Sequence, residues 1–344
     1  MTGAEIAKEK NSTRWVARPG KALSVLSFIL LLVVLLSLMV GRYPGMGILT
    51  PEGLANDQLA QRLIWNLRLP RLLVAVMVGM CLATAGEVFQ MIFANPLVES
   101  GFLGVSQGAA FGAALCIVYL GSNAWKVQIS AACFAFLGLI LSYFMARQIR
   151  YGGWVLRLVL AGIAVSALFS SAVGVLKYLA DPMRQLPEIT FWLLGGLWSI
   201  TWVQFLSILP VVILGLALLF HMRWRLNLLS LEDQTAFSLG ASPGRERALL
   251  LGSSVAITAV VVSVSGMVGW VGLIVPHLAR RLFGSDARFA LPGAMLIGGL
   301  FVVVCDDLAR TLLVGEIPLG ILTSLLGAVG FILLLSTQNL HFQR

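Results

Sequence analysis

The sequence predicts an all-α polytopic membrane protein, on the strength of two observations. Apolar residues make up 59% of the 344 residues and charged residues 11%, whereas an average soluble domain carries about a quarter charged residues. The apolar residues also gather into runs, and a bilayer-spanning helix needs only about 20 of them in succession. The mean hydropathy of +0.93 agrees with this assignment.

Ten transmembrane helices are expected, at about residues 22–41, 70–93, 102–121, 127–146, 155–180, 202–221, 248–267, 268–283, 289–309 and 318–337. The eighth run is short and meets the seventh at Gly266 to Gly269, which indicates a tight turn or half-helix. The expected organisation is therefore a cytoplasmic tail over 1–21, a ten-span domain over 22–337 and a second cytoplasmic tail over 338–344. A polar segment over 222–247 interrupts the spans.

The distribution of basic residues predicts the topology. The net charge of +9 comes from Lys and Arg placed between apolar runs, with no basic stripe of the kind that binds nucleic acid. Most of them fall in the tail and in the loops that an N-in, C-in arrangement puts inside. Arg42, Arg62, Arg68 and Arg71 in the first outside loop are exceptions to the positive-inside rule.

No cofactor, metal site or disulfide is expected. The cysteines lie singly within apolar runs and the histidines are scattered, at Cys81, Cys116, Cys133, Cys305, His221, His277 and His341. Small apolar packing residues explain the cysteines better than metal ligation does.

A weak internal repeat is present. The spacing of Gly86, Pro96 and Gly104 recurs 180 residues later at Gly266, Pro276 and Gly284. The match equates span 2 with span 7, which run in opposite directions. It therefore predicts an inverted repeat of spans 2–5 and 7–10, an arrangement typical of transporters.

Short motifs follow one another from about residue 60 to 335. They are Arg68-Leu-Pro-Arg71, Asn95-Pro-Leu97, Leu103-Gly-Val-Ser106, Gly108-Ala109, Leu160-Ala-Gly162, Leu239-Gly240, Val271 to His277, Ala279-Arg280, Asp306, Ala309-Arg310 and Glu316 to Gly320. Together they resemble the permease subunits of binding-protein-dependent ABC importers for iron chelates and vitamin B12 (FecCD-type, type II importers). The resemblance implies a multi-pass protein of the bacterial inner membrane.

The same resemblance implies three protein partners. They are a homodimeric ABC ATPase, a periplasmic or lipid-anchored substrate-binding protein, and a second permease protomer, most simply a copy of this chain. The substrate would be an iron chelate, with a ferric siderophore favoured over haem and cobalamin. The chain has no Gly-x4-Gly-Lys-Ser/Thr motif, so ATP hydrolysis by that route would lie on another chain and the permease itself would not be an enzyme.

Two sets of site residues follow from the resemblance at opposite membrane faces. Arg68, Arg71 and Arg310 would dock acidic residues of the binding protein, although anchoring to lipid headgroups is the simpler reading of each arginine alone. The polar segment over 222–247 would form coupling helices that contact the ATPase through Leu228, Leu231, Ala236, Leu239 and Gly240. Glu232 stands where the family usually has glycine, which puts the local turn in doubt.

The cytoplasmic gate would combine the turn Asn95, Pro96 and Leu97 with Val155 and Leu156 before span 5. The family has a Thr-Ser pair at the latter positions, so a more apolar gate is expected here. Proline in the turn frees a backbone carbonyl, which Asn95 or water would have to satisfy.

The pathway candidates are Glu87, Gln90, Ser106 and Gln107. A carboxylate in mid-span is costly unless it is paired or protonated, so Glu87 should face the bundle interior or the pathway. A helix–helix contact is favoured over substrate contact and proton binding. Asp306 and Arg310 are spaced to pair on one helix face, with Asp307 nearby.

Aromatic residues cluster near the outer end of span 5, at Tyr178, Phe191, Trp192, Trp198 and Trp202. An interfacial belt is favoured over ligand stacking. Residues 191–199 are expected to form a short outer helix, as in the family.

A second function remains open from the residues alone. An ion-coupled secondary transporter would use Glu87 with Asp306 or Asp307 as coupling carboxylates, and the inverted repeat suits it equally well.

Overall fold

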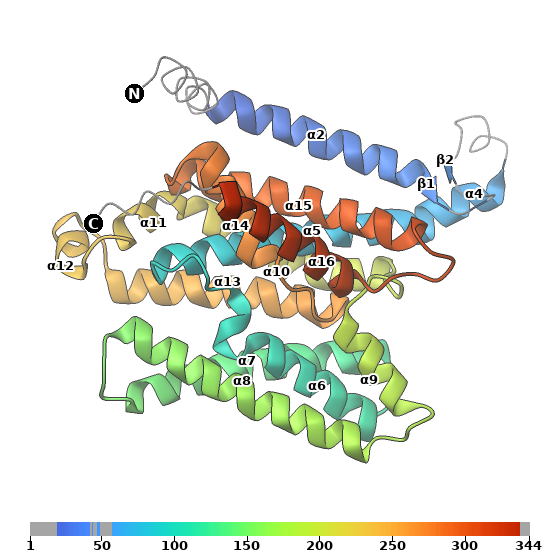
Figure 1. Cartoon of the computed structure of the whole chain (residues 1–344), viewed down its shortest axis with the longest axis horizontal. Coiled ribbons are helices and arrows are strands. Elements are labelled where there is room, and N and C mark those ends of the chain that lie inside the picture. Colours follow the sequence, from blue (N-terminus) through green and yellow to red (C-terminus); the bar gives the residue numbers. More distant parts are fainter. Residues whose placement is uncertain (1–18, 42, 44–46, 49–56, 338–344) are drawn as a thin grey trace.

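The computed structural model describes residues 19–41, 43, 47–48 and 57–337. The long helices lie roughly side by side along one axis (Figure 1). The first elements are α2 (Pro19–Met39), β1 (Val40–Gly41), β2 (Gly47–Ile48), α4 (Gln58–Leu63), the π-helix η1 (Ile64–Arg68), α5 (Leu69–Ile92), the 3-10 helix η2 (Ser100–Leu103), α6 (Val105–Tyr119), α7 (Ala124–Gln148) and α8 (Trp154–Leu179). The remaining elements are α9 (Gln185–Leu194), α10 (Trp202–His221), α11 (Arg223–Leu229), α12 (Asp233–Ser238), α13 (Pro243–Ser265), α14 (Val271–Phe283), α15 (Ala287–Thr311) and α16 (Leu319–Thr337).

Each apolar run that predicts a span overlaps one of these helices. Among the described residues, seven helices are long and apolar enough to cross a membrane, and α6 and α16 contain shorter apolar helices. The half-helix expected for the eighth run is α14, whose 13 residues rise only about 20 Å. The expected tails lie almost wholly outside the described residues.

The helix expected over residues 191–199 is wrong in its bounds, because α9 covers Gln185–Leu194. Gly195 ends the helix at φ 69°, in a conformation that a side chain would strain. A Cβ at Gly195 would also lie 2.4 Å from the Met267 carbonyl oxygen, so the chain passes too close to the end of α13 for the helix to continue.

Helix α5 is the centre of the bundle. In the most apolar part of Gln58–Ile92, the helical stretch that ends with α5, 78% of the residues are buried. The corresponding fraction in α2, which lies along one edge of the molecule (Figure 1), is 6%. Helix α5 packs on α15, α13 and α14. At the α15 crossing, a Cβ on Gly79 would lie 2.0 Å from the Gly298 carbonyl oxygen, so the two backbones meet without side chains between them.

The two halves share an order of elements. A long helix, a break, a short helix and two further helices occur as α5 to α8 and again as α13 to α16. In Figure 1, α5 begins beside α4 and α13 begins beside α12, so the two run antiparallel, as the inverted repeat requires. We call the two ends of the bundle the α4 end and the α12 end.

The residue matching behind the repeat is wrong, because none of its three pairs occupies equivalent positions. Gly86 lies within α5 whereas Gly266 follows α13, and Pro96 follows α5 whereas Pro276 lies inside α14. Gly104 precedes the short helix α6 in a left-handed conformation, whereas Gly284 follows the short helix α14. The local equivalent of Gly104 is Trp270, which precedes α14 at φ 71° against 77° for Gly104. A bulky residue in this conformation is strained by about 1 to 3 kcal/mol, and such strain concentrates at functional positions.

Candidate functional site

Arg71, near the start of α5, is held by two carboxylates of its own chain. Its Nη2 atom lies 2.9 Å from Oδ1 of Asp306, and its Nη1 atom lies 3.0 Å from Oε1 of Glu316. The Asp306 side chain is completely buried, whereas the Glu316 side chain is 37% exposed. Arg71 therefore connects α5 with α15 and with the segment that joins α15 to α16.

Arg310, on α15, shares one of these carboxylates. Its Nε atom lies 3.1 Å from Oδ2 of Asp306, four residues earlier. The guanidinium also pairs with Asp307 and lies 3.1 Å from the Oγ atom of Ser37 on α2. The pairing of Asp306 with Arg310 along one helix face is confirmed.

Arg68 differs from the other two arginines. Its Nη1 atom donates to the Leu38 carbonyl oxygen at 3.0 Å, and it forms no ion pair within the part of the chain that the structure describes. All three arginines and Glu316 line one cavity of about 330 Å³ at the α4 end, which we call the arginine pocket. The structure thus gathers the three predicted docking residues, but two of them already hold carboxylates.

Glu87 is paired across the bundle. Its Oε2 atom lies 2.6 Å from Nη1 of Arg280, on α14, and the two side chains are 0% and 20% exposed. Gly86 beside it approaches the Gly272 backbone closely enough to exclude a Cβ, so α5 and α14 meet tightly here. Among the alternatives for Glu87, the helix–helix contact is the one that the structure contains.

Gln90 completes this contact. Its Nε2 atom donates to the carbonyl oxygens of Gly272 and Leu273, at 3.2 and 3.1 Å, and Arg280 donates to its Oε1 atom. The sequence had named Glu87 and Gln90 as pathway candidates without Arg280. The cost of a buried carboxylate demands a cation close by, but this signal does not say which residue supplies it.

The other two pathway candidates lie in the first turn of α6. Ser106 and Gln107 are both half-buried, one turn after the left-handed Gly104. Neither lines the cavities described in this section. A role in the pathway therefore remains a prediction for both.

The turn after α5 is closed by its asparagine. The Oδ1 atom of Asn95 accepts a hydrogen bond from the Leu97 backbone N–H at 2.9 Å. The expected role of Asn95 was to satisfy a freed carbonyl, but its amide oxygen satisfies a backbone donor instead. Leu97 is exposed beyond this turn.

The two predicted gate segments lie together. Phe93, at the end of α5, stacks on Trp154, the first residue of α8, with ring centroids 6.3 Å apart and planes 5° apart. Val155 and Leu156 follow directly, and Leu156 is 43% exposed. The stack brings the Asn95 turn and the start of α8 to one place near the α12 end.

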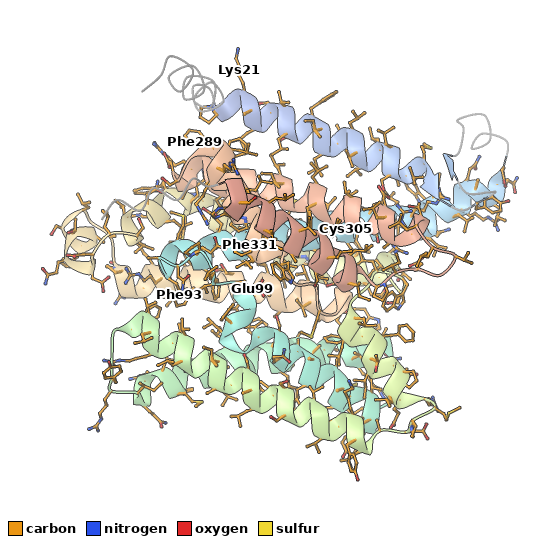
Figure 2. The ribbon with its side chains drawn as sticks, in the orientation of Figure 1. Lys21, Phe93, Glu99, Phe289, Cys305 and Phe331 are labelled. Atoms are coloured by element: carbon orange, nitrogen blue, oxygen red, sulfur yellow. The ribbon has the colours of Figure 1, made fainter. Side chains whose placement is uncertain are left out.

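A cavity of about 640 Å³ opens beside the gate turn. It is lined by Leu97, Glu99, Trp270 and Phe331, among others. Glu99 and Phe331 both lie in the middle of the bundle in Figure 2. The strained Trp270 and Glu99 are two residues of this cavity that the sequence analysis did not name, and only Trp270 follows a glycine-rich break that marks it.

The predicted aromatic belt divides into two groups. Phe191, Trp192 and Trp198 line a cavity of about 790 Å³, the aromatic pocket. Tyr178 is 89% exposed, and the Nε1 atom of Trp202 donates to the Trp65 carbonyl oxygen at 2.9 Å. The first group lines a pocket and the second does not, and an interfacial position stays a prediction for both groups.

Comparison with protein families decides the class. A model of the FecCD transport family matches residues 29–337, which is most of the chain. The chain belongs to the FecCD transport family. As a FecCD protein it is an ABC importer permease, a multi-pass transport component.

Individual relatives of this FecCD chain carry different cargo names. The hemin transport system permease protein HmuU of Yersinia pestis is 41% identical over 92% of this chain and 96% of its own length. The molybdate import system permease protein MolB of Haemophilus influenzae is 38% identical over 90% and 93%. A solved structure of an inward-facing metal-chelate type ABC transporter shares 37% identity and a TM-score of 0.85, over 92% of this chain and 99% of its own.

The predicted coupling residues of this FecCD chain lie at the α12 end (Figure 1). Leu231 and Leu239 are exposed, as is Phe237, which the sequence analysis missed, whereas Ala236 is buried. Leu228, on α11, is half-buried. The exposed leucines and Phe237 form an apolar surface on a polar segment, a composition suited to contact with another protein.

The turn around α12 is well formed. Glu232 precedes the helix at φ −58°, which any residue adopts, so the missing family glycine causes no strain. Gly240 follows the helix at φ 81°. The Gly240 N–H donates to Phe237 O and the Ala241 N–H to Ala236 O, both at 3.0 Å, as in a Schellman motif.

Helix α11 is tied to the start of α15. The Nδ2 atom of Asn227 donates to Oδ1 of Asp286 at 2.8 Å, and its Oδ1 atom accepts from the Ala287 N–H at 2.9 Å. A hydrogen bond from the Arg288 side chain, with help from the α15 N-terminus and Asn227, lowers the pKa of Asp286 to about 2. The carboxylate therefore stays ionised as the cap of α15.

One cavity of about 510 Å³ brings these elements together, and we call it the junction pocket. Its lining includes Asn95 from the gate turn, Gln90 and Arg280 from the buried contact, and Asn227 and Asp286 from the tie between α11 and α15. The predicted gate and the predicted coupling segment thus share one cavity wall.

Proposed function

We propose that this chain is the membrane-spanning half of an importer powered by a separate ABC ATPase homodimer and supplied by a substrate-binding protein. The observation that carries the proposal is the junction pocket, where the gate turn and the coupling segment meet through Asn95, Gln90, Arg280 and Asn227. A force on α12 would pass to α11, which contacts both α5 and α15 beside this pocket.

We further propose an orientation. The α12 end faces the cytoplasm of a bacterial inner membrane and the α4 end faces outward, with both chain termini inside. Arginines at 223, 225, 245 and 247 beside the coupling segment support this orientation. A second copy of the chain completes the passage, and Arg68, Arg71 and Arg310 receive the binding protein.

The proposed cargo is an iron chelate, with a ferric siderophore first and haem and cobalamin as alternatives. The hemin permease and the metal-chelate transporter structure support this class, while the molybdate relative supports a different one. The binding protein selects the ligand, so the permease sequence constrains the cargo weakly.

The ion-coupled alternative loses support from the pairing of its carboxylates. Glu87 is paired with Arg280, and Asp306 is shared by Arg71 and Arg310. A coupling carboxylate has to exchange a proton or bind a cation, and a guanidinium at hydrogen-bond distance opposes both. Neither residue is therefore a suitable coupling site.

Reconstitution tests the proposal directly. Vesicles would contain the chain alone or together with a P-loop ATPase that co-purifies with it. Uptake of a ⁵⁵Fe-labelled siderophore, haem and cobalamin would be measured with and without ATP. We expect ATP-dependent uptake only with the second protein and the binding protein. Accumulation by the chain alone along a proton or sodium gradient would refute the importer assignment.

A further inference from the structure

Arg71 has two carboxylate partners that differ in how replaceable they are. Asp306 is completely buried and also pairs with Arg310, so its displacement would break the ion pairs of two arginines at once. Glu316 is 37% exposed and pairs only with Arg71 among the described residues. An exposed ion pair contributes little net stability, so exchanging Glu316 for another carboxylate is inexpensive.

The charges of the arginine pocket balance. Arg68, Arg71 and Arg310 line the pocket, and the last two are paired with Asp306, Asp307 and Glu316, so three positive charges stand against three negative ones. An acidic partner that docked here without displacing any group would add negative charge to a neutral cluster. An acidic side chain of that partner can form an ion pair with Arg71 only if one of the three carboxylates moves away.

We propose that Glu316 occupies the place on Arg71 that an acidic side chain of the docking protein takes, so that docking proceeds by exchange of one carboxylate for another. This inference rests on the proposed function, because it assigns a competitor to the proposed docking site. Glu316 thereby sets the affinity and the reversibility of docking.

The surroundings of Glu316 suit a movement of the side chain alone. The backbone directly after Glu316 is held at two points, because the Ile317 N–H donates to Ala309 O at 3.1 Å and the Leu319 N–H donates to Gly195 O at 2.9 Å. Glu316 lines both the arginine pocket and the larger aromatic pocket, which also contains Gln128. A displaced carboxylate therefore has a neighbouring cavity to enter, in which Gln128 and Gln204 can donate hydrogen bonds within a mainly apolar lining.

The test is the affinity of the ligand-free substrate-binding protein of the same transporter for the permease complex in lipid nanodiscs. Glu316→Gln keeps the shape and removes the charge that competes for Arg71. We expect docking to become about threefold to tenfold tighter, since the partner no longer displaces an ion pair. The control is Glu188→Gln, which removes a carboxylate from the aromatic pocket that forms no ion pair with a described residue.

A double-mutant cycle separates competition for Arg71 from a general change in charge. In an Arg71→Gln background, Glu316→Gln should leave the docking affinity unchanged within about twofold. Equal gains from Glu316→Gln and Glu188→Gln, or the same gain in both backgrounds, would overturn the exchange.

Other outcomes are equally decisive. If the binding protein docks to the wild type and Glu316→Gln docks no more tightly, the exchange fails while the proposed function stands. If no docking to the wild type is measured, the proposed docking function fails first. Size-exclusion profiles that match the wild type establish that each variant is folded.

Discussion

The charged side chains near the two ends of α5 are neutralised in different ways. At the α4 end, Arg71 belongs to a cluster of three arginines and three carboxylates, one of which is exposed. Toward the α12 end, Glu87 and Arg280 form one ion pair, supplemented by Gln90. The first arrangement allows partners to be exchanged, and the second does not.

This difference teaches what each end is suited to do. A buried pair is costly to break, because the remaining charge has no substitute. Such a contact holds α5 and α14 in register beside the junction pocket. A shared cluster with one exposed member can rearrange when another charged surface arrives, which suits a docking site.

The largest effect is expected from breaking the Glu87–Arg280 pair. Arg280→Leu leaves the fully buried Glu87 without a cation, at a cost of about 3 to 5 kcal/mol in folding free energy. Glu87→Leu should cost less, about 1 to 3 kcal/mol, because Arg280 lines the junction pocket, where water can reach it. The measurement is the temperature at which half of the detergent-solubilised protein stays monodisperse.

The double variant Glu87→Leu with Arg280→Leu is the control for this prediction. It removes both charges, so it should recover most of the stability that Arg280→Leu loses. If the double variant is less stable than either single variant, the ion pair is not the source of the effect. The proposed role of this pair in holding α5 and α14 in register would then be wrong.

The next effect concerns docking at the exchangeable end. Arg68 has no carboxylate partner among the described residues, so Arg68→Glu should weaken binding-protein docking by about tenfold to a hundredfold without removing an ion pair of the cluster. Arg71→Glu would add loss of the Asp306 pair, which makes it a less specific change. The measurement is the dissociation constant in nanodiscs at low and high salt.

Arg62→Glu provides the matched control for Arg68→Glu. Arg62 is exposed on α4, at the same end of the bundle, and does not line the arginine pocket. Arg62→Glu makes the same change in charge, but it can affect docking only through long-range electrostatics. This contribution is screened at physiological salt. Equal losses for the two variants would remove Arg68 from the docking site.

Much of this comparison could be anticipated from the sequence. Long apolar runs located the helices, and the spacing of Asp306 and Arg310 predicted their pairing, because both signals are local in the chain. The Glu87–Arg280 contact joins residues 193 apart and could not be found by spacing. Only the energetic requirement of a buried carboxylate pointed to a missing cation, without saying which one.

Failures in the sequence analysis have a similar physical origin. The short helix after span 5 was displaced because Gly195 passes close to Met267, a contact between segments distant in the chain. The repeat was matched on the spacing of glycine and proline, which led to Gly284, whereas Trp270 adopts the left-handed conformation that corresponds to Gly104. Tertiary contacts decided both cases.

A smaller effect is expected at the coupling surface of the α12 end. Gly240→Ala forces a side chain into a left-handed conformation, which costs about 1 kcal/mol and loosens the end of α12. Uptake should fall while ATP hydrolysis continues, measured as substrate moved per ATP in vesicles. Gly244→Ala is the control, because it lies in the first turn of α13, also in open space but with no left-handed backbone. Normal coupling in the Gly240 variant would remove this turn from the mechanism.

The smallest effect tests how firmly the α12 end is held. Asp286→Ala removes the cap of α15 and one bond to Asn227, at an expected cost of about 1 kcal/mol. The pKa of Asp286 lies at about 2, below its ordinary value of 3.8, so its contribution is complete above about pH 4 and is lost as the pH falls toward 2. The difference in thermal stability between wild type and variant should therefore be constant from pH 8 to pH 5 and shrink below pH 4. A difference that already varies between pH 8 and pH 5 would mean that another group titrates with the cap and that the tie between α11 and α15 is weaker than its geometry implies.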